Sequence, residues 1–181
     1  MTPVFRDARE DDVLTLAALA TQVFFDTYAT EGITPALARE ASAVYAPEVM
    51  ASRLRDPAVH IIVATLGLAL TAFVDLTEDT TCPVDGVRGM EVFRLYVQRP
   101  FQRHGLGRAL MAQAQAQARE RGHVGLWLTA WAGNQRALNF YRALGFVDMG
   151  ATTYVIDGQG FENRVLTQRL SPSAVPGAFP L

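Results

Sequence analysis

The sequence contains no lysine, so all sixteen of its basic side chains are arginines. Chemistry that uses a lysine amine is therefore excluded, and so is the Walker A phosphate loop, which requires that residue. The formal net charge is −2 and no basic tract occurs, so we expect no nucleic-acid partner. Cysteine is scarce as well: Cys82 stands alone, no internal disulfide can form, and a cytoplasmic location is expected.

A long uninterrupted hydrophobic run is also missing. From Pro57 to Val74 no charged residue occurs, but proline, histidine, threonine and glycine interrupt the apolar residues. Two buried strands joined by a tight turn at Gly67 explain this segment better than a membrane-spanning helix. The beginning of the chain carries several charges of both signs, which does not fit a signal peptide. We therefore expect no membrane partner.

Length and periodicity predict a single mixed α/β domain over residues 1–170, followed by an extended or disordered tail at 171–181. In chain order we expect a strand at 4–6, a helix from 11 or 12 to 29, a helix at 34–56 with a kink or break at Pro47, strands at 59–66 and 68–76, a turn-rich stretch at 78–89, a strand at 90–98, a helix at 106–121, a strand at 124–130, a helix at 135–144, and strands at 146–155 and 164–170.

The segment from Glu91 to Gly122 carries the most informative local pattern. A buried strand is followed by Gln102-Arg103-His104-Gly105-Leu106-Gly107 and then by a helix. Glycines before a helix start leave backbone N–H groups free to bind phosphate. The dinucleotide pattern with a third glycine is absent, because a long glycine-free helix follows Gly107. A plain strand-to-helix turn would show the same two glycines, so this segment alone leaves both interpretations open.

A second pattern lies one strand later, at Asn134-Gln-Arg-Ala137-Leu-Asn-Phe140-Tyr141-Arg-Ala-Leu-Gly145-Phe146. An amphipathic helix with an Asn cap and a Gly stop explains its members one by one, but not both motifs in this order and spacing. The two segments resemble the signatures of the GNAT superfamily of N-acetyltransferases, R/Q-x-x-G-x-G/A and N-x-x-A-x-x-F-Y-x-x-x-G-F. The likeness covers residues 3–170, and its specific motifs lie in 91–108 and 126–146.

Three further segments look like the bacterial polyamine (spermidine/spermine) N-acetyltransferase branch of that superfamily: Phe24-Phe-Asp-Thr-Tyr28, Glu91-x-x-x-Leu-Tyr-Val and Trp131-x-x-Asn134. The resemblance implies an α/β (α+β) fold of the GNAT type. Its central sheet would be mixed and mostly antiparallel, with about seven strands, splayed between strands 4 and 5 and flanked by four helices. A β-bulge commonly opens the fourth strand in that fold.

The resemblance also implies acetyl-CoA as cofactor, with its pantetheine arm in the gap between strands 4 and 5. The backbone of Leu95, Tyr96 and Val97 would bind the acetyl and pantetheine amide groups, and Asn134 would reach the cofactor with its amide. The pyrophosphate would lie against the loop and helix start, formed by Gln102, Arg103, His104, Gly105, Leu106, Gly107 and Arg108. Small residues let phosphates approach the backbone closely.

Catalysis in this family implies two proton movements. Tyr141 matches the tyrosine that protonates the leaving thiolate, with a packing role as the alternative. Glu91 lies where some members carry a general base, and it would deprotonate the amine through water. An ordinary strand-end carboxylate, or an anionic subsite that holds a cationic amine, explains Glu91 equally well. His60, His104 and His123 have no metal-ligand spacing, so no metal is expected.

The acceptor is expected to be the primary amine of a small, polyamine-like molecule. Its site would be built from the first two helices, with Phe25, Asp26, Tyr28 and Glu31 as candidates for charge and cation–π contacts. Core packing and surface charge are the alternative roles of these four residues. An enzyme that acetylates a protein N-terminus or lysine, and a non-catalytic acyl-CoA sensor, remain open as alternatives. A homodimer is possible by analogy.

Overall fold

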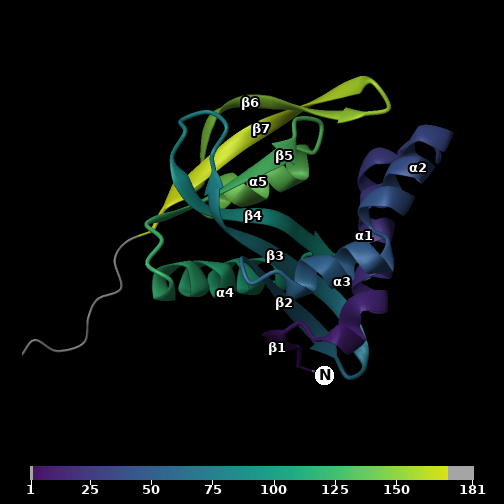
Figure 1. Cartoon of the computed structure of the whole chain (residues 1–181), viewed down its shortest axis with the longest axis horizontal. Helices are drawn as coiled ribbons and strands as arrows, with labels where there is room; N and C mark the ends of the chain where they lie inside the picture. Colours follow the sequence, from purple (N-terminus) through teal and green to yellow (C-terminus); the bar gives the residue numbers. More distant parts are fainter. Residues whose placement is uncertain (1, 171–181) are drawn as a thin grey trace, which may run out of the picture.

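Seven strands form one sheet in the order β1-β2-β3-β4-β5-β7-β6 (Figure 1). Every neighbouring pair is antiparallel except β4 and β5, which run parallel. The computed structural model describes residues 2–170, so the predicted tail at 171–181 lies outside the described residues. The strands are β1 (Val4–Asp7), β2 (Val59–Leu66), β3 (Ala69–Thr81), β4 (Arg88–Val97), β5 (Gly125–Trp131), β6 (Val147–Ile156) and β7 (Gln159–Arg169).

Five α-helices accompany the sheet within residues 2–170, one more than the four expected. They are α1 (Val13–Tyr28), α2 (Pro35–Val44), α3 (Pro47–Arg55), α4 (Leu106–Glu120) and α5 (Gln135–Ala143). The extra helix arises because the predicted helix at 34–56 breaks before Pro47, which occupies the first turn of α3. Proline lacks an N–H and its ring clashes with the preceding turn, so it starts a helix more readily than it continues one.

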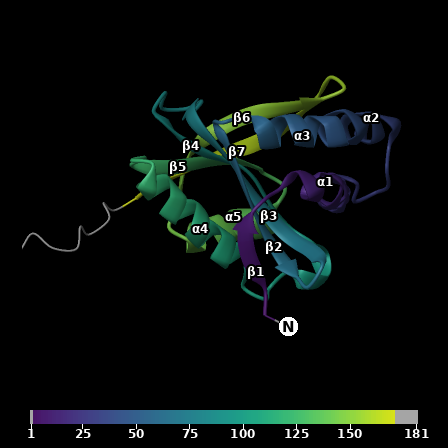
Figure 2. The same cartoon turned by 60° about the horizontal axis from the view of Figure 1, so that its bottom comes forward.

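The helices lie on both faces of the sheet: α1, α2 and α3 cover one face, and α4 and α5 cover the other (Figures 1 and 2). Alternation along β2 divides the apolar side chains between the two layers. Ile61 and Val63 pack with α1–α3, whereas Ile62 and Ala64 pack with α4 and α5. None of the helices within residues 2–170 has the length and apolar composition needed to cross a membrane.

Two strands are longer than the sequence predicted. The polar stretch at 78–89 was expected to be turn-rich, yet β3 continues to Thr81 and pairs with the start of β4 at Arg88. Its threonines are β-branched and favour extended backbone despite their polarity. Similarly, β7 begins at Gln159 rather than at 164, immediately after a turn at Asp157-Gly158, because its polar first half pairs with β6.

The parallel pair at the centre of the sheet is very short. β4 and β5 share register only at Met90–Leu126 and Glu91–Trp127, and the two strands then separate. On its other side β4 carries a bulge, because Asp75 pairs with Arg94 while the next residue of β3 pairs with Val92. Phe93 is thus the extra residue, and a bulge turns the following side chain to the opposite face. The expected splay and the expected bulge are both confirmed.

Candidate active site

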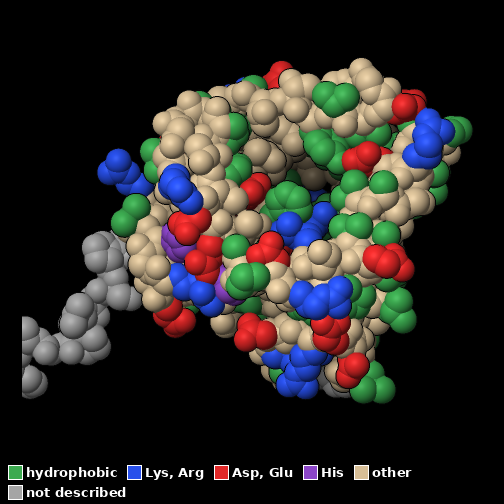
Figure 3. Space-filling view, in the orientation of Figure 1, with side chains coloured by type: hydrophobic (Ala, Val, Ile, Leu, Met, Phe, Trp, Pro, Cys, Tyr) green, Lys and Arg blue, Asp and Glu red, His purple; other side chains and the backbone are tan. Residues whose placement is uncertain are grey.

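The separation of β4 and β5 opens a cavity of about 550 Å³. Figure 3 shows the surface hollowed near its centre, with acidic and basic side chains around the hollow. The structure brings most of the predicted site residues to this one cavity. They are Asp26, Tyr28, Glu91, Leu95, Tyr96, Val97, Gln102, Arg103, Gly105, Gly107, Arg108, Asn134 and Tyr141.

Four predicted residues do not line the cavity. Phe25 is partly buried and packs against the core between the sheet and α1–α3, and its neighbour Phe24 reaches the cavity instead. Leu106 points into the core beneath α4 and is 5 % exposed. Glu31 and His104 lie on the surface outside the cavity lining. Adjacent residues in a helix or loop point in different directions, and a match to a motif does not say which of them face the cavity.

The loop before α4 has the geometry of an anion site. Gly105 caps α4 with φ of +83°, and Arg103 also adopts a positive φ of 67°. A residue other than glycine is rarely found there, and such turns direct successive N–H groups to one side. Gln102 anchors the loop, because its Nε2 donates to the carbonyl of Val97 at 2.9 Å. The N–H groups of the first turn of α4 have no carbonyl partner within the helix.

The space beside Gly107 is bounded by α5 and β4. A Cβ atom built there would lie 3.4 Å from the ring of Phe140 on α5 and 3.8 Å from the side chain of Val97. A larger side chain would therefore fill the space between the loop, β4 and α5. The exposed first-turn N–H groups and this narrow floor fit a phosphate group lying directly on the backbone. Arg103, Arg108 and Arg136 supply positive charge at the same end of the cavity.

Asn134 shows why a polar residue follows β5. Its Oδ1 accepts a hydrogen bond from the N–H of Ala137 at 3.1 Å and caps α5. The side chain also lines the cavity. The capping bond leaves the NH₂ group of Asn134 available for the predicted cofactor contact.

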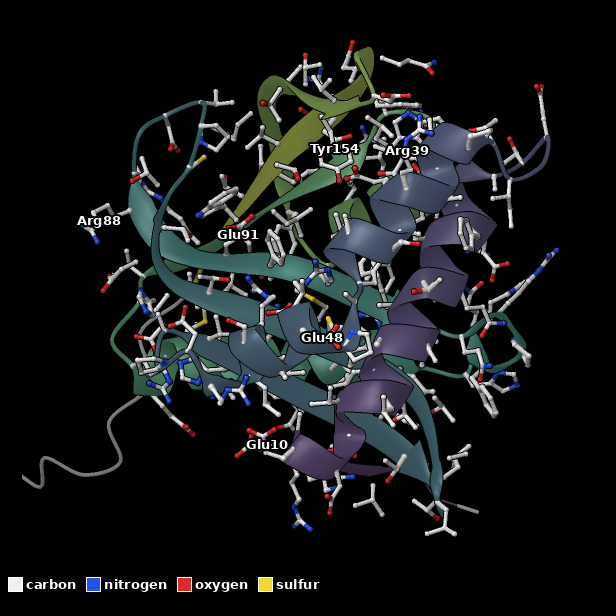
Figure 4. All side chains as sticks on the ribbon, turned by 45° about the vertical axis from the view of Figure 1, so that its right-hand side comes forward. Glu10, Arg39, Glu48, Arg88, Glu91 and Tyr154 are labelled. Carbon is white, nitrogen blue, oxygen red and sulfur yellow. The ribbon has the colours of Figure 1, made fainter. Side chains whose placement is uncertain are left out.

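Glu91 is the carboxylate of the cavity with the most perturbed pKa. Burial raises the pKa of Glu91 to about 7. The nearby guanidinium groups of Arg53 and Arg94 oppose this rise, whereas the charge of Asp75 adds to it. Glu91 lies on the face of β4 that is turned toward α2 and α3 (Figure 4). A carboxyl group with a pKa near neutrality is suited to accept a proton at physiological pH.

A buried ion network lies beside Glu91. The carboxylate of Asp75 is fully buried and receives Arg53 Nη2 at 2.7 Å, Arg53 Nε at 2.9 Å and Arg94 Nη1 at 2.9 Å. Both guanidinium groups also lie over the ring of Phe93, at 4.1 and 4.4 Å from its centroid. The bulge at Phe93 makes this possible, because it directs Arg94 toward Asp75. The network holds α3, β3 and the wall of the cavity together.

We expect Asp75→Asn to destabilise the protein by about 3–5 kcal/mol, because the buried Arg94 and the partly buried Arg53 would lose their counter-ion. This corresponds to a fall of roughly 10 °C in melting temperature for a domain of this size. Thermal unfolding measures it, with Asp79→Asn, an exposed aspartate on the same strand, as the matched control. An unchanged melting temperature in Asp75→Asn would show that the network contributes nothing to stability.

Tyr141 on α5 forms part of the cavity wall. Its ring packs against Phe140 and Phe146 at 5.3 and 5.7 Å between centroids, and the residue is 8 % exposed. Burial raises the pKa of the Tyr141 hydroxyl far above its ordinary value, so this group stays protonated. Among residues 2–170 its hydroxyl has no hydrogen-bond partner, although it lines the cavity. A protonated, unpaired hydroxyl is available to donate a proton.

Aromatic side chains form the wall of the cavity on the side of α1–α3. Tyr28 packs on Trp131 at 5.4 Å between ring centroids, and the hydroxyls of Tyr45 and Tyr96 are 2.9 Å apart. Tyr154 on β6 bonds to Glu40 on α2. Sequence reasoning missed the tyrosines at 45 and 154 as cavity residues. No motif marked them, because they come from elements that meet only in the folded sheet.

An α/β sheet opened at its one parallel pair, with a helix start suited to an anion at the opening, forms a binding site for a phosphate-bearing ligand. The chain matches the model of the Acetyltransferase (GNAT) family over residues 24–146 and belongs to this family. It is therefore an acetyl-CoA-dependent N-acetyltransferase.

Three similar proteins illustrate the relationship. An N-acetyltransferase from the pepI 3′ region of Lactobacillus delbrueckii subsp. lactis is 23% identical over 81% of this chain and 86% of its own length. A ribosomal protein bS18-alanine N-acetyltransferase of Salmonella typhimurium is 36% identical over 41% of this chain and 51% of its own length. The crystal structure of the PaiA N-acetyltransferase from Thermoplasma acidophilum, in complex with coenzyme A, has a TM-score of 0.74 at 18% identity, covering 93% of this chain and 99% of that one.

These similarities support the family and the cofactor, but they do not single out one acceptor. One relative is named for a ribosomal protein substrate, whereas the sequence predicted a polyamine acetyltransferase. The polyamine branch therefore stays a prediction. A homodimer and a cytoplasmic location stay predictions as well.

Proposed function

We propose that this protein transfers the acetyl group of acetyl-CoA to the primary amine of a small molecule, by direct attack in a ternary complex. The observation that carries the proposal is Glu91, whose pKa is about 7 and which lies in a cavity with aromatic walls. The cationic groups Arg103 and Arg108 lie beyond the end of β4, and the carboxylate lies near its start. This separation of charge suits an anionic cofactor at one end and a cationic acceptor at the other.

Acetyl-CoA, when bound, supplies an activated acyl carbon and a thiolate leaving group. The acceptor arrives as an alkylammonium ion with a pKa of about 10, so it needs to lose a proton before it can attack. In our proposal Glu91 removes that proton through water. Aromatic faces of Tyr28 and Trp131 help to bind the cationic acceptor by cation–π contact.

The reaction also requires stabilisation of the acetyl oxygen and protonation of the leaving sulfur. In our proposal β4 and α5 supply these two functions. Backbone N–H groups of β4 near the bulge stabilise the charge that develops on the acetyl oxygen. The Tyr141 hydroxyl protonates the departing sulfur, because burial keeps it in the acid form. No covalent enzyme intermediate is needed in this scheme, and Cys82 is buried at 2 % exposure away from the cavity lining.

A second candidate, acetylation of a protein N-terminal amine, is favoured by the similarity to the bS18-alanine N-acetyltransferase. Free-thiol release from acetyl-CoA distinguishes the two, with putrescine, spermidine, butylamine and an alanine-starting peptide as acceptors. We expect turnover with the small amines and none with the peptide. Turnover with the peptide alone would replace our proposal by the second candidate. No turnover with any acceptor, while acetyl-CoA still binds in calorimetry, would favour a non-catalytic acyl-CoA-binding role.

A further inference from the structure

Asn163 on β7 is a buried amide with an unused hydrogen-bonding atom. The residue is 8 % exposed, and its Oδ1 is completely buried without a hydrogen-bond partner among residues 2–170. Asn163 lines the same cavity as Glu91. Buried side-chain oxygens are nearly always paired, because leaving one unpaired costs the hydration that it had in the unfolded chain. An exception in the wall of a cavity is a candidate contact for a ligand.

The strand pairing places this amide at the aromatic end of the cavity. Asn163 lies opposite Trp131 on β5 and opposite Thr152 on β6, and directly paired residues have side chains on the same face of a sheet. Trp131 in turn packs on Tyr28 and on Phe161, which lies two residues before Asn163 on β7. The amide oxygen is therefore one polar acceptor within a mostly aromatic wall.

The backbone around Asn163 is held in place by its two neighbours on β7. The carbonyl of Glu162 accepts a hydrogen bond from Ala132 N–H at 2.8 Å. Arg164 donates from Nε and Nη2 to Asp148 on β6, at 3.1 and 2.7 Å. The Glu162 bond lies in the plane of the sheet, and the Arg164 side chain holds the strand from the face opposite to Asn163. The main chain thus keeps Asn163 at the cavity wall.

We propose that Asn163 determines acceptor specificity by accepting a hydrogen bond from a second donor group of the substrate. The acceptor class is then a primary amine that also carries an N–H or O–H group, such as a diamine or an amino alcohol. This inference rests on the proposed function, since Glu91 receives the proton of the reacting amine while Asn163 binds the other end. A simple alkylamine of equal length would leave the amide oxygen unpaired and bind less well.

The test compares two acceptors of matched length, 1,4-diaminobutane and butylamine. In the wild-type enzyme we expect kcat/KM for the diamine to exceed that for butylamine by about 10- to 100-fold. In Asn163→Leu, which keeps the size of the side chain, the ratio falls to roughly 1, mainly through a higher KM for the diamine. Asn139→Leu, on the exposed face of α5 and outside the cavity, serves as the matched control and keeps the wild-type ratio.

Asn163→Asp provides a rescue variant, because it retains an oxygen acceptor at the same place and is expected to keep the preference for the diamine. An unchanged ratio in Asn163→Leu, or loss of the preference in Asn163→Asp, would overturn the role of the Oδ1 atom. In either case butylamine turnover would continue, so the proposed function would stand. If the wild-type enzyme acetylates neither amine, the proposed function fails and the specificity role fails with it.

Discussion

Glu91→Gln is expected to lower kcat/KM for the amine by about 10²- to 10⁴-fold at pH 8, since it removes a general base and keeps the shape of the side chain. The wild-type enzyme should lose activity tenfold per pH unit below about 7, where the carboxylate becomes protonated. The residual activity of Glu91→Gln should lack this acidic limb. Steady-state thiol release between pH 5.5 and 9 measures both effects.

Glu48→Gln is the matched control for this substitution, because Glu48 is an exposed glutamate on α3 (Figure 4). It should retain the wild-type rate and pH profile. A full acidic limb in Glu91→Gln would assign the titration to another group and reduce Glu91 to an anionic subsite. That outcome would favour the alternative role of Glu91, in which its carboxylate only binds the cationic amine.

Glu91→Gln is expected to lower activity but to raise the stability of the protein at pH 8. Folding raises the pKa of Glu91 from its ordinary 4.5 to about 7, so the folded state holds this proton more tightly than the unfolded state. The wild-type protein therefore loses stability as the pH rises from about 4.5 through 7. Glu91→Gln should show a higher melting temperature than the wild type at pH 8, and this advantage should disappear near pH 4.5.

Tyr141→Phe is expected to reduce kcat by roughly 10²- to 10³-fold, because the leaving thiolate would lose its proton donor. The affinity for acetyl-CoA should stay near the wild-type value, since the phenyl ring preserves the packing on Phe140 and Phe146. The acidic limb near pH 7 should also remain, because it belongs to Glu91. Thiol release together with calorimetric titration of acetyl-CoA separates these effects.

An unchanged kcat in Tyr141→Phe would disprove the acid role and leave Tyr141 as a packing residue. A lower melting temperature combined with weaker acetyl-CoA binding would point to the same conclusion. The melting temperature of the variant is therefore measured first. Only a folded variant that binds acetyl-CoA and fails to turn over supports proton donation by the hydroxyl.

The parts of the site that local sequence predicted are those that one continuous segment forms. The loop at Gln102 to Gly107 and the helix from Asn134 have their shapes determined by glycines and caps close in sequence. For this reason both motifs indicated the cavity before the structure was known. The break at Pro47 was predicted for the same local reason, although it added a helix to the expected number.

Other parts of the site depend on contacts between segments that are distant in the chain, and hydrophobic periodicity does not predict such contacts. In the sequence Asp75 is a single charged residue within a predicted strand. In the structure it forms ion pairs with Arg53 on α3 and Arg94 on β4. Asn163 follows a polar stretch and carries no motif, and only the register of β7 brings it beside Trp131. The pKa of Glu91 likewise follows from burial in the assembled sheet. Pairings of this kind involve residues far apart in the chain.

The short pairing of β4 with β5 also affects how the protein responds to its cofactor supply. A sheet that divides in the middle has two extra strand edges, whose main-chain N–H and C=O groups lack strand partners. Acetyl-CoA binds the folded chain and not the unfolded one, so it adds to the unfolding free energy by mass action. At one hundred times its dissociation constant the gain is about 2.7 kcal/mol. Removal of acetyl-CoA would therefore leave the folded chain less stable by the same amount.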